Sequence, residues 1–306
     1  MYSTNSSIYF SSRNSSFVKY STIKTYGVSD VEQFTIDGER YLAIANAHND
    51  THSRVSSVVY KFNQHFLKKG KPPFSIVQKI VTEKIESIQF FRSNKKHFLL
   101  IFENVKNSTP TIYEWERKHF VKRSNYGWQI RGCLRGITPI EIDSSMYFIC
   151  ESVNPTHEVT SLYKWTGSSF NEFQTFESSR NRKMYGFKAN GNAFLVASSS
   201  EFGKFKNTYI YRWNGTKFTF HQVLFEDIGE GGHIFVNKKN KNTYLAVPTD
   251  IHDSWTVYSI KTDGFFQLQQ KIKRPADSLY SFKHIGNIYI AIANYYGNSS
   301  IYKWFC

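Results

Sequence analysis

The feature that most constrains this chain is a short aromatic strand motif that recurs along its whole length. The clearest copies are Leu-Tyr-Lys-Trp at 162–165, Ile-Tyr-Arg-Trp at 210–213 and Ile-Tyr-Lys-Trp at 301–304. The central tyrosines are Tyr9, Tyr60, Tyr113, Tyr163, Tyr211, Tyr258 and Tyr302, with successive spacings of 51, 53, 50, 48, 47 and 44 residues. A strand-rich repeat of this length is typical of a β-propeller, in which each repeat forms one blade.

Each period begins with two strands joined by a tight turn. In the first complete copy, Phe34 precedes Asp37-Gly38 and Tyr41 follows it, and Asn190-Gly191 lies in the same place in a later copy. Asp-Gly and Asn-Gly tolerate the positive φ angles that two-residue hairpin turns need. The second strand is apolar at successive positions, as in 41–45, which indicates burial on both faces. We predict six such hairpins, starting near Gln33, Ser87, Thr138, Tyr185, His233 and Tyr280.

A second hairpin completes each period. Its first strand carries the tyrosine motif, and its closing strand often contains a glutamine between apolar residues. These glutamines are Gln78, Gln174, Gln222 and Gln270. We interpret them as edge-strand hydrogen-bonding residues rather than catalytic ones. With the four strands named A to D in order, the chain begins and ends at a C strand, and residues 17–23 form the first D strand.

These patterns predict an all-β fold, a β-propeller of four-stranded antiparallel blades. We expect seven blade positions within a single domain, 1–306, with the first blade reduced to strands C and D and the last lacking strand D. The alternative is a six-bladed ring in which 17–23 supplies the missing last D strand.

The repeat resembles the epilepsy-associated repeat, also called the EAR or EPTP repeat, of the leucine-rich glioma-inactivated proteins and related adhesion receptors. The matching pieces are Phe-x-Ile-x-Gly-x-x-Tyr-Leu-Ala-Ile-Ala-Asn at 34–46, Tyr-Arg-Trp-Asn-Gly-x-x-Phe at 211–218, Phe-x-x-Phe-Gln-x-Phe at 170–176 and Ile-Tyr-Lys-Trp at 301–304. The resemblance covers essentially the whole chain. It implies a seven-bladed propeller that binds other proteins outside the cell and has no enzyme activity.

The chain departs from this family pattern at its start, where a leading D strand and the first A and B strands are missing. We therefore expect an N-terminally shortened domain that lacks roughly 35–40 residues. No secretory signal peptide is visible after Met1, and no apolar run reaches the length of a membrane helix. Following the resemblance, we predict an extracellular or secreted protein.

Charge supports a second hypothesis. The formal net charge is +15, and basic runs occur at 68–71, 95–96, 238–241 and 271–274. A basic surface attracts sulfated glycans or nucleic acid. The runs lie in different repeats and different turns, so we rank this electrostatic binder, with a glycosaminoglycan as its partner, below a protein-binding module and expect no nucleic acid.

No pattern of catalytic or metal-binding residues emerges from the sequence. The ten histidines form no zinc motif, and neither a phosphate-binding loop nor a nucleophile elbow is present. We therefore predict no enzyme activity and no cofactor. Asp30, Glu32 and Glu86 lie near the starts of A strands and are weak candidates for binding calcium, although solvated carboxylates are the simpler interpretation. Of the three cysteines, Cys133 and Cys150 could pair in an exported protein.

The connections between B and C strands vary most in length, and variable loops on a fixed scaffold are where binding usually resides. They span 47–57, 103–111, 151–161, 198–208, 248–255 and 295–299. Two glycosylation sequons, at Asn49 and Asn107, fall within them. We predict this loop set as the protein-binding surface. The predicted contact residues are Phe202, Phe205, Trp255, Tyr295 and Tyr296, with packing beneath their own loops as the alternative.

Overall fold

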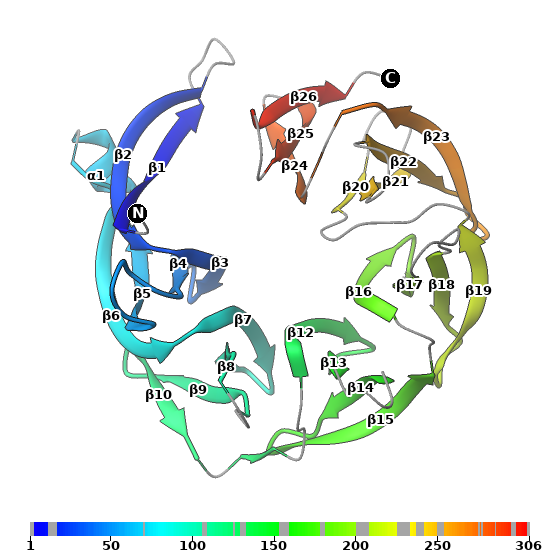
Figure 1. The fold of residues 1–306 in the computed structure, drawn as a ribbon, viewed down its shortest axis with the longest axis horizontal. Helices are drawn as coiled ribbons and strands as arrows, with labels where there is room; N and C mark the ends of the chain where they lie inside the picture. Colours follow the sequence, from blue (N-terminus) through cyan, green and yellow to red (C-terminus); the bar gives the residue numbers. More distant parts are fainter. Residues whose placement is uncertain are drawn as a thin grey trace. The chain divides into compact units, whose positions relative to one another are not determined.

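The computed structural model describes most of the chain. The described residues are 3–11, 17–69, 71–105, 109–124, 126–128, 133–152, 159–177, 181–199, 208–224, 233–236, 242–249, 254–274, 276, 278–284, 286–294 and 298–304. The chain divides into two compact units, Met1–Thr175 and Phe176–Cys306. Both units are built almost entirely of β-strands (Figure 1).

In its described residues the first unit contains fifteen strands, the last of which continues two residues past its end, and one short helix. They are β1 (Ser3–Ser11), β2 (Phe17–Tyr26), β3 (Val28–Ile36), β4 (Glu39–Asn46), β5 (Arg54–Phe62), α1 (Gln64–Lys68), β6 (Phe74–Glu83), β7 (Ile85–Ser93), β8 (Lys96–Glu103), β9 (Thr111–Glu116), β10 (His119–Arg123), β11 (Gly127–Trp128), β12 (Cys133–Ile142), β13 (Ser145–Ser152), β14 (Val159–Trp165) and β15 (Ser169–Glu177).

The second unit contains eleven strands. They are β16 (Asn181–Ala189), β17 (Asn192–Ser199), β18 (Thr208–Trp213), β19 (Phe218–Leu224), β20 (His233–Val236), β21 (Thr243–Thr249), β22 (Ser254–Ile260), β23 (Phe266–Ile272), β24 (Ser278–His284), β25 (Asn287–Ala293) and β26 (Ser300–Trp304).

The strands form seven sheets in the described residues. Four sheets have the order β3-β4-β5-β6, β7-β8-β9-β10, β16-β17-β18-β19 and β20-β21-β22-β23. A fifth, β12-β13-β14-β15, gains the two-residue strand β11 at its outer edge, parallel to β15. The first sheet contains only β1 and β2, and the last only β24, β25 and β26.

This succession confirms the predicted fold class, a β-propeller of four-stranded antiparallel blades. All six A–B hairpins form as predicted, and β1 and β2 occupy the predicted first C and D positions. Six sheets have three strands or more, so the number of blades agrees with the six-bladed alternative rather than with seven full positions. The two-stranded sheet of β1 and β2 precedes these six in the chain. The sequence did not predict β11 or the helix α1.

The Asp-Gly and Asn-Gly turns have the conformation that their residues favour. Asp37 and Gly38 have φ angles of 50° and 77°, and Asn190 and Gly191 have 50° and 76°. Both residues of each pair are therefore left-handed, which glycine and asparagine tolerate better than other residues. These turns fix the register of each first hairpin.

The core lies between neighbouring sheets of the same unit rather than inside any one sheet. One cluster joins Phe34 of β3 to Ile88 of β7, and another joins Phe98 of β8 to Phe148 of β13. In the second unit a cluster joins Val196 of β17 to Tyr258 of β22. The B strands β4 and β8 are buried on both faces, as predicted, because their residues belong to hydrophobic clusters on either side of their sheets. In β25, by contrast, buried residues alternate with more exposed ones.

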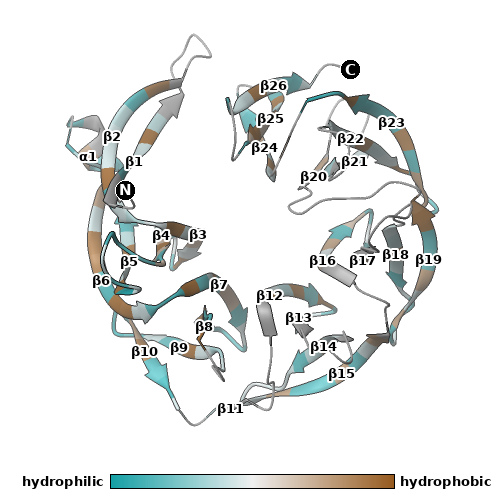
Figure 2. Ribbon diagram, viewed as in Figure 1, coloured by the Kyte–Doolittle hydropathy of each residue, from teal (hydrophilic) through white to brown (hydrophobic). Residues whose placement is uncertain are grey.

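Hydrophilic residues lie on elements at the outer edges of some of the sheets. Figure 2 shows hydrophilic residues along β10 and β15, the outermost antiparallel strands of their sheets, and on α1. No helix in the described part of the chain has the length and apolar content needed to cross a membrane.

Candidate functional site

The outer strands are connected between blades by a repeated glutamine contact, which we call the glutamine clamp. The Gln78 side chain on β6 accepts a hydrogen bond from the Phe120 backbone N–H at 2.7 Å and donates one to the Phe120 carbonyl at 2.8 Å. Gln222 on β19 makes the same pair with Phe266 on β23, at 2.8 and 2.9 Å. The predicted edge-strand hydrogen bonds are therefore confirmed at Gln78 and Gln222, and their partner is the next blade's backbone.

A β-bulge precedes the clamp glutamine. In the pairing of β5 with β6, Val59 faces Gln78 but Tyr60 faces Ile76, so one residue of the outer strand is left over. The same shift occurs before Gln222 and before Gln270, each time at the repeated tyrosine. A bulge re-aims the side chains beside it. In keeping with that role, the third outer strand, β10, has neither a glutamine nor a register shift.

In three of the four-stranded sheets a polar pair joins the second strand to the third, and in the β7–β10 sheet the positions of acid and base are exchanged. In the β3–β6 sheet Lys61 bonds Glu39 at 3.1 Å, and in the β16–β19 sheet Arg212 donates to Asn192 at 2.7 Å. In the β7–β10 sheet the acid is Glu114 on β9 and the base is Lys96 on β8, 2.7 Å apart. In each of these sheets the pair is a contact between neighbouring strands.

Glu114 is a functional-looking residue that sequence reasoning missed. Its carboxylate is buried and accepts bonds from Arg123 Nε at 3.0 Å and the Tyr126 hydroxyl at 2.8 Å, besides Lys96. Burial opposes ionisation, but these three donors outweigh it and lower the pKa of Glu114. Burial and the bond to Glu114 raise the pKa of Tyr126 to about 12. Every oxygen is used, so the carboxylate is a structural anchor.

The acids named as calcium candidates are also used by the scaffold. Asp30 accepts hydrogen bonds from the Ile88 backbone N–H at 3.0 Å and from Gln89 Nε2 at 3.2 Å. Glu32 accepts one from the Phe90 backbone N–H at 3.2 Å. Burial raises the pKa of both carboxyls, that of Glu32 to about 7.

Glu86 lies apart from this pair and accepts a bond from Asn104 Nδ2 at 2.6 Å. Within the described residues no three His, Cys, Asp or Glu side chains group closely enough to hold a metal ion.

The B–C connection of the second blade position, at 47–53, is held by its own polar residues. Asn49 Oδ1 accepts bonds from the backbone N–H groups of Thr51 at 2.9 Å and His52 at 2.7 Å. Ala47 donates to the Gly27 carbonyl at 3.0 Å. A side chain on Gly27 would meet His48 at 2.8 Å, so the loop packs directly on the turn between β2 and β3. This loop presents an ordered surface.

Of the five predicted contact residues, the structure describes only Trp255. Trp255 lies on β22, is 2% exposed and packs against Tyr302 with ring centroids 5.6 Å apart. Trp255 is therefore packed inside the protein, and a side chain with so little exposed area has no surface to offer a partner. Phe202, Phe205, Tyr295 and Tyr296 lie outside the described residues.

The described residues include a disulfide-bonded cysteine. Cys150 on β13 is buried and disulfide-bonded. The neighbouring strand β12, which pairs with β13, carries Cys133, the partner proposed from the sequence. The Cys133–Cys150 pairing itself stays a prediction.

Comparisons with known proteins agree with the resemblance found in the sequence. The EPTP domain model matches residues 16–63. A human thrombospondin-type laminin G domain and EAR repeat-containing protein is 32% identical over 102 residues, which are 33% of this chain and 14% of that protein. Mouse leucine-rich glioma-inactivated protein 1 is 29% identical over 181 residues, 54% of this chain and 31% of the relative.

The longest of these similarities is to human leucine-rich repeat LGI family member 2, with 22% identity over 291 residues, 94% of this chain and 42% of that protein. The matches therefore span less than half the length of each of these relatives. The predicted resemblance to EAR/EPTP repeat proteins is confirmed.

Solved structures support the fold alone. Hydrazine synthase of Kuenenia stuttgartiensis superposes with a TM-score of 0.60 and 14% identity, covering 97% of this chain and 89% of that one. A putative 6-phosphogluconolactonase from Bacteroides uniformis gives a TM-score of 0.61 and 9% identity, covering 94% and 87%. At these identities the shared feature is the blade architecture.

Proposed function

We propose that this chain is a non-catalytic extracellular protein-binding module that acts in cell-surface recognition. The observation that carries the proposal is the contrast between the two ends of the blades. Five of the six A–B connections have two residues and only that between β20 and β21 is longer, whereas the B–C connections differ in length on a scaffold clamped from blade to blade. Variable loops on a rigid support suit recognition of a protein partner. The likeness to EAR and leucine-rich glioma-inactivated proteins points the same way.

An extracellular location is supported by covalent chemistry. Disulfides such as that of Cys150 persist in oxidising compartments. The Asn49 sequon lies on the ordered 47–53 loop, where Asn49 Oδ1 accepts a bond from Thr51 Oγ1 at 3.1 Å. No hydrogen bond from the Asn49 amide nitrogen is present among the described residues, so that nitrogen is available to carry a glycan.

A non-catalytic role fits the use of the ionisable groups. The carboxylates with shifted pKa values, those of Asp30, Glu32 and Glu114, all accept hydrogen bonds that join strands or blades. Shifted groups often mark active sites, but structural networks shift them as well. The enzymes among the similar structures share too little sequence to transfer an activity.

The partner would bind at the B–C connections, with Phe202, Phe205, Tyr295 and Tyr296 as the remaining proposed contacts. The test is a pull-down from cell-surface extract with the purified chain and with Phe205→Ala and Tyr296→Ala variants. The matched control is Phe265→Ala, because Phe265 is an exposed aromatic residue in the turn between β22 and β23, a C–D turn.

We expect one specific partner to be captured by the unchanged chain and the control, and captured poorly by the other two variants. Equal capture by all four proteins would place the binding surface elsewhere. Turnover of a glycan or ester substrate without capture of any protein would refute the module itself.

The formal net charge of +15 supports a second candidate function, electrostatic binding of sulfated glycans. Contacts with several sulfate groups give an affinity that falls steeply with salt. Elution from a heparin column well above physiological salt would favour this alternative, and elution near physiological salt would demote it.

A further inference from the structure

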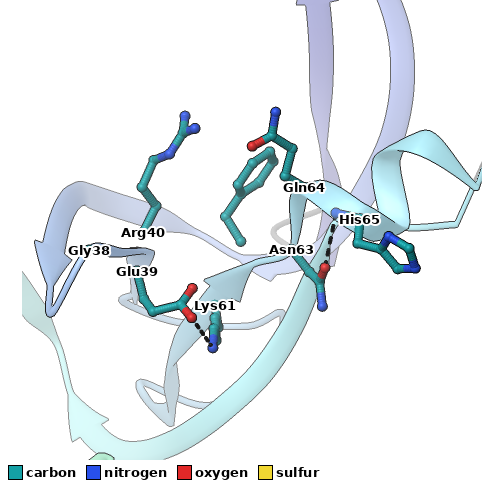
Figure 3. A pocket seen from close by; sticks show the side chains of 8 residues that line it. Gly38, Glu39, Arg40, Lys61, Asn63, Gln64 and His65 are labelled. Carbon is teal, nitrogen blue, oxygen red and sulfur yellow. Dashed lines mark hydrogen bonds and ion pairs between the residues drawn. The ribbon is translucent and has the colours of Figure 1, made fainter.

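A polar pocket lies at one end of the β3–β6 sheet, beside the A–B turn and the start of the C–D connection. It encloses about 300 Å³ and is lined by Gly38, Glu39, Arg40, Lys61, Phe62, Asn63, Gln64 and His65. Figure 3 shows Arg40 and Gln64 extending toward the same side of the pocket, with Glu39 and Lys61 together on the other. Because A–B turns and B–C connections lie at opposite ends of a blade, this pocket is separate from the proposed protein-binding surface.

One wall of the pocket belongs to an insertion particular to this blade. The connection between β5 and β6 runs from 63 to 73 and contains α1, whereas β9 and β10 are joined by Arg117 and Lys118 alone. The insertion is anchored at Asn63. Its backbone N–H donates to the Pro73 carbonyl at 2.7 Å, and its Oδ1 accepts the His65 backbone N–H at 3.1 Å. Gln64 and His65 are thereby fixed at the pocket edge.

The opposite wall is a cation placed on an aromatic ring. Arg40 follows the A–B turn, and its guanidinium carbon lies 5.1 Å from the centroid of the Phe62 ring. Phe62 occupies the position that is tryptophan in most copies of the motif. The positions equivalent to Arg40 in the other A–B hairpins hold His97, Met146, Ala193, Thr243 and Ile288. Among these hairpins, only that of the β3–β6 sheet combines an arginine, Arg40, with a phenylalanine, Phe62, in place of the motif tryptophan.

The charges of the pocket leave Arg40 without a counterion. Lys61 is neutralised by Glu39, 3.1 Å away, and Arg40 is exposed with no carboxylate partner among the described residues. With His65 neutral, the lining therefore carries a net charge of +1. The N–H groups of a guanidinium form a planar fork that matches two oxygens of a planar anion.

We propose that this pocket binds a single carboxylate group. Arg40 donates two parallel N–H bonds to its oxygens, the Gln64 amide supplies a further donor, and Phe62 covers the apolar part next to the carboxylate. A net charge of +1 fits a monoanion, whereas a doubly charged phosphate would be left half neutralised. The proposal does not depend on the protein-binding function. The carboxylate comes either from a free small acid or from an acidic side chain of a peptide.

Saturation-transfer difference NMR on the full chain at low salt tests the proposal, with acetate as the first probe. We expect a saturable acetate signal in the millimolar range and at least a fivefold loss in Arg40→Gln. Arg54→Gln is the matched control, because Arg54 is an exposed arginine at the other end of the same sheet, and it should keep the full signal. Gln64→Glu, which adds a negative charge to the pocket edge, should also weaken acetate binding.

Two further arms separate the sources and the chemistry. A blocked Gly-Glu-Gly tripeptide that saturates at lower concentration than acetate assigns the site to peptide side chains, and the reverse order assigns it to free acids, with Gly-Gln-Gly as the uncharged control. The proposal is overturned by an acetate signal that Arg40→Gln leaves unchanged, by no saturable signal, or by phosphate displacing acetate at concentrations below acetate's own half-saturation. Unchanged thermal unfolding of Arg40→Gln shows that the variant is folded.

Discussion

Gln222 and Gln270 occupy the same position in successive outer strands, but they meet different surroundings. Gln222 bonds both backbone groups of Phe266 in the next sheet. Gln270 is exposed on β23, and in the described residues the next sheet, β24-β25-β26, has no fourth strand. The sequence marks the two residues as equivalent, and only the structure distinguishes them. The pair therefore provides a matched comparison of one residue type with and without its clamp.

Replacing Gln222 by Leu should lower the free energy of unfolding by about 1–2 kcal/mol, because the two backbone groups of Phe266 lose their partner. Gln270→Leu should change it by less than about 0.5 kcal/mol. Urea unfolding of both variants measures the difference. Equal losses in the two variants would remove the energetic role assigned to the clamp.

Glu32 gives the protein a pH dependence near neutrality. In the folded chain its carboxyl holds a proton up to about pH 7, whereas its ordinary pKa is 4.5. The stabilising contribution is therefore complete below about pH 4.5 and is lost as the pH rises through 7. Asp30 shifts in the same direction.

Glu32→Gln mimics the protonated form and keeps an acceptor for the Phe90 N–H. At pH 8 the variant should be more stable than the unchanged chain by about 1–2 kcal/mol, a value reduced because the side chain is only partly buried. At pH 5 the two should differ little. Thermal unfolding between pH 5 and 8 tests this, with the exposed Glu83→Gln as control, and parallel curves for all three proteins would contradict it.

At the scale of the strand, the aromatic motif is the main packing element. The Trp165 side chain is 4% exposed. Its ring centroid lies 4.6 Å from that of Phe170, 5.3 Å from that of Tyr126 and 5.8 Å from that of Phe91. Trp213, at the same position of the motif, is only half-buried and meets Phe218 at 5.2 Å. Equivalent motif positions thus differ in burial.

Trp165→Ala should lower the free energy of unfolding by about 3–5 kcal/mol, since a large buried side chain leaves a cavity. The same change at Trp213 should cost less, about 1–2 kcal/mol, because less area is buried. Denaturant unfolding monitored by circular dichroism gives both values. A larger loss at Trp213 than at Trp165 would show that the motif is not stabilised through burial between sheets.

The sequence was sufficient to predict the order of the strands. Turn residues such as Asp37-Gly38 and the fixed period act locally, so they can be recognised without the fold. The helix α1 was missed because five residues are too few to form a helix on propensity alone. It depends on Asn63 and on the closing bond to Pro73.

Site features were harder to predict because they depend on contacts between distant residues. The Glu114 network joins three strands of one sheet, and the spacing of its residues in the sequence matches no motif that would predict it. Trp255 was placed in a loop, but β22 starts at Ser254 and all seven of its residues are buried. The pocket at Arg40 combines the 63–73 insertion with a phenylalanine, Phe62, in place of the motif tryptophan. An alignment of the repeats would have shown both features in the same blade.

At the scale of the molecule, each compact unit contains one described glutamine clamp, Gln78–Phe120 in the first and Gln222–Phe266 in the second. In repeat proteins, stability is close to a sum over repeats and their interfaces. The effects of distant sites that share no partners generally add.

The double variant Gln78→Leu/Gln222→Leu should therefore lose the sum of the two single losses, within about 0.5 kcal/mol. Urea unfolding of the four proteins completes the cycle. A coupling energy above about 1 kcal/mol, of either sign, would show that the clamps act as one cooperative system rather than as separate connectors.

The clamp also bears on how such a chain can evolve. The glutamine binds the N–H and carbonyl of the following repeat, groups that every residue except proline carries, and it makes no demand on the receiving side chain. A duplicated or recombined repeat would therefore bring its own connector and fit a neighbour of diverged sequence. A repeat that carries the bulge and the glutamine could therefore acquire a new neighbour without a change of architecture, while its loops diverge.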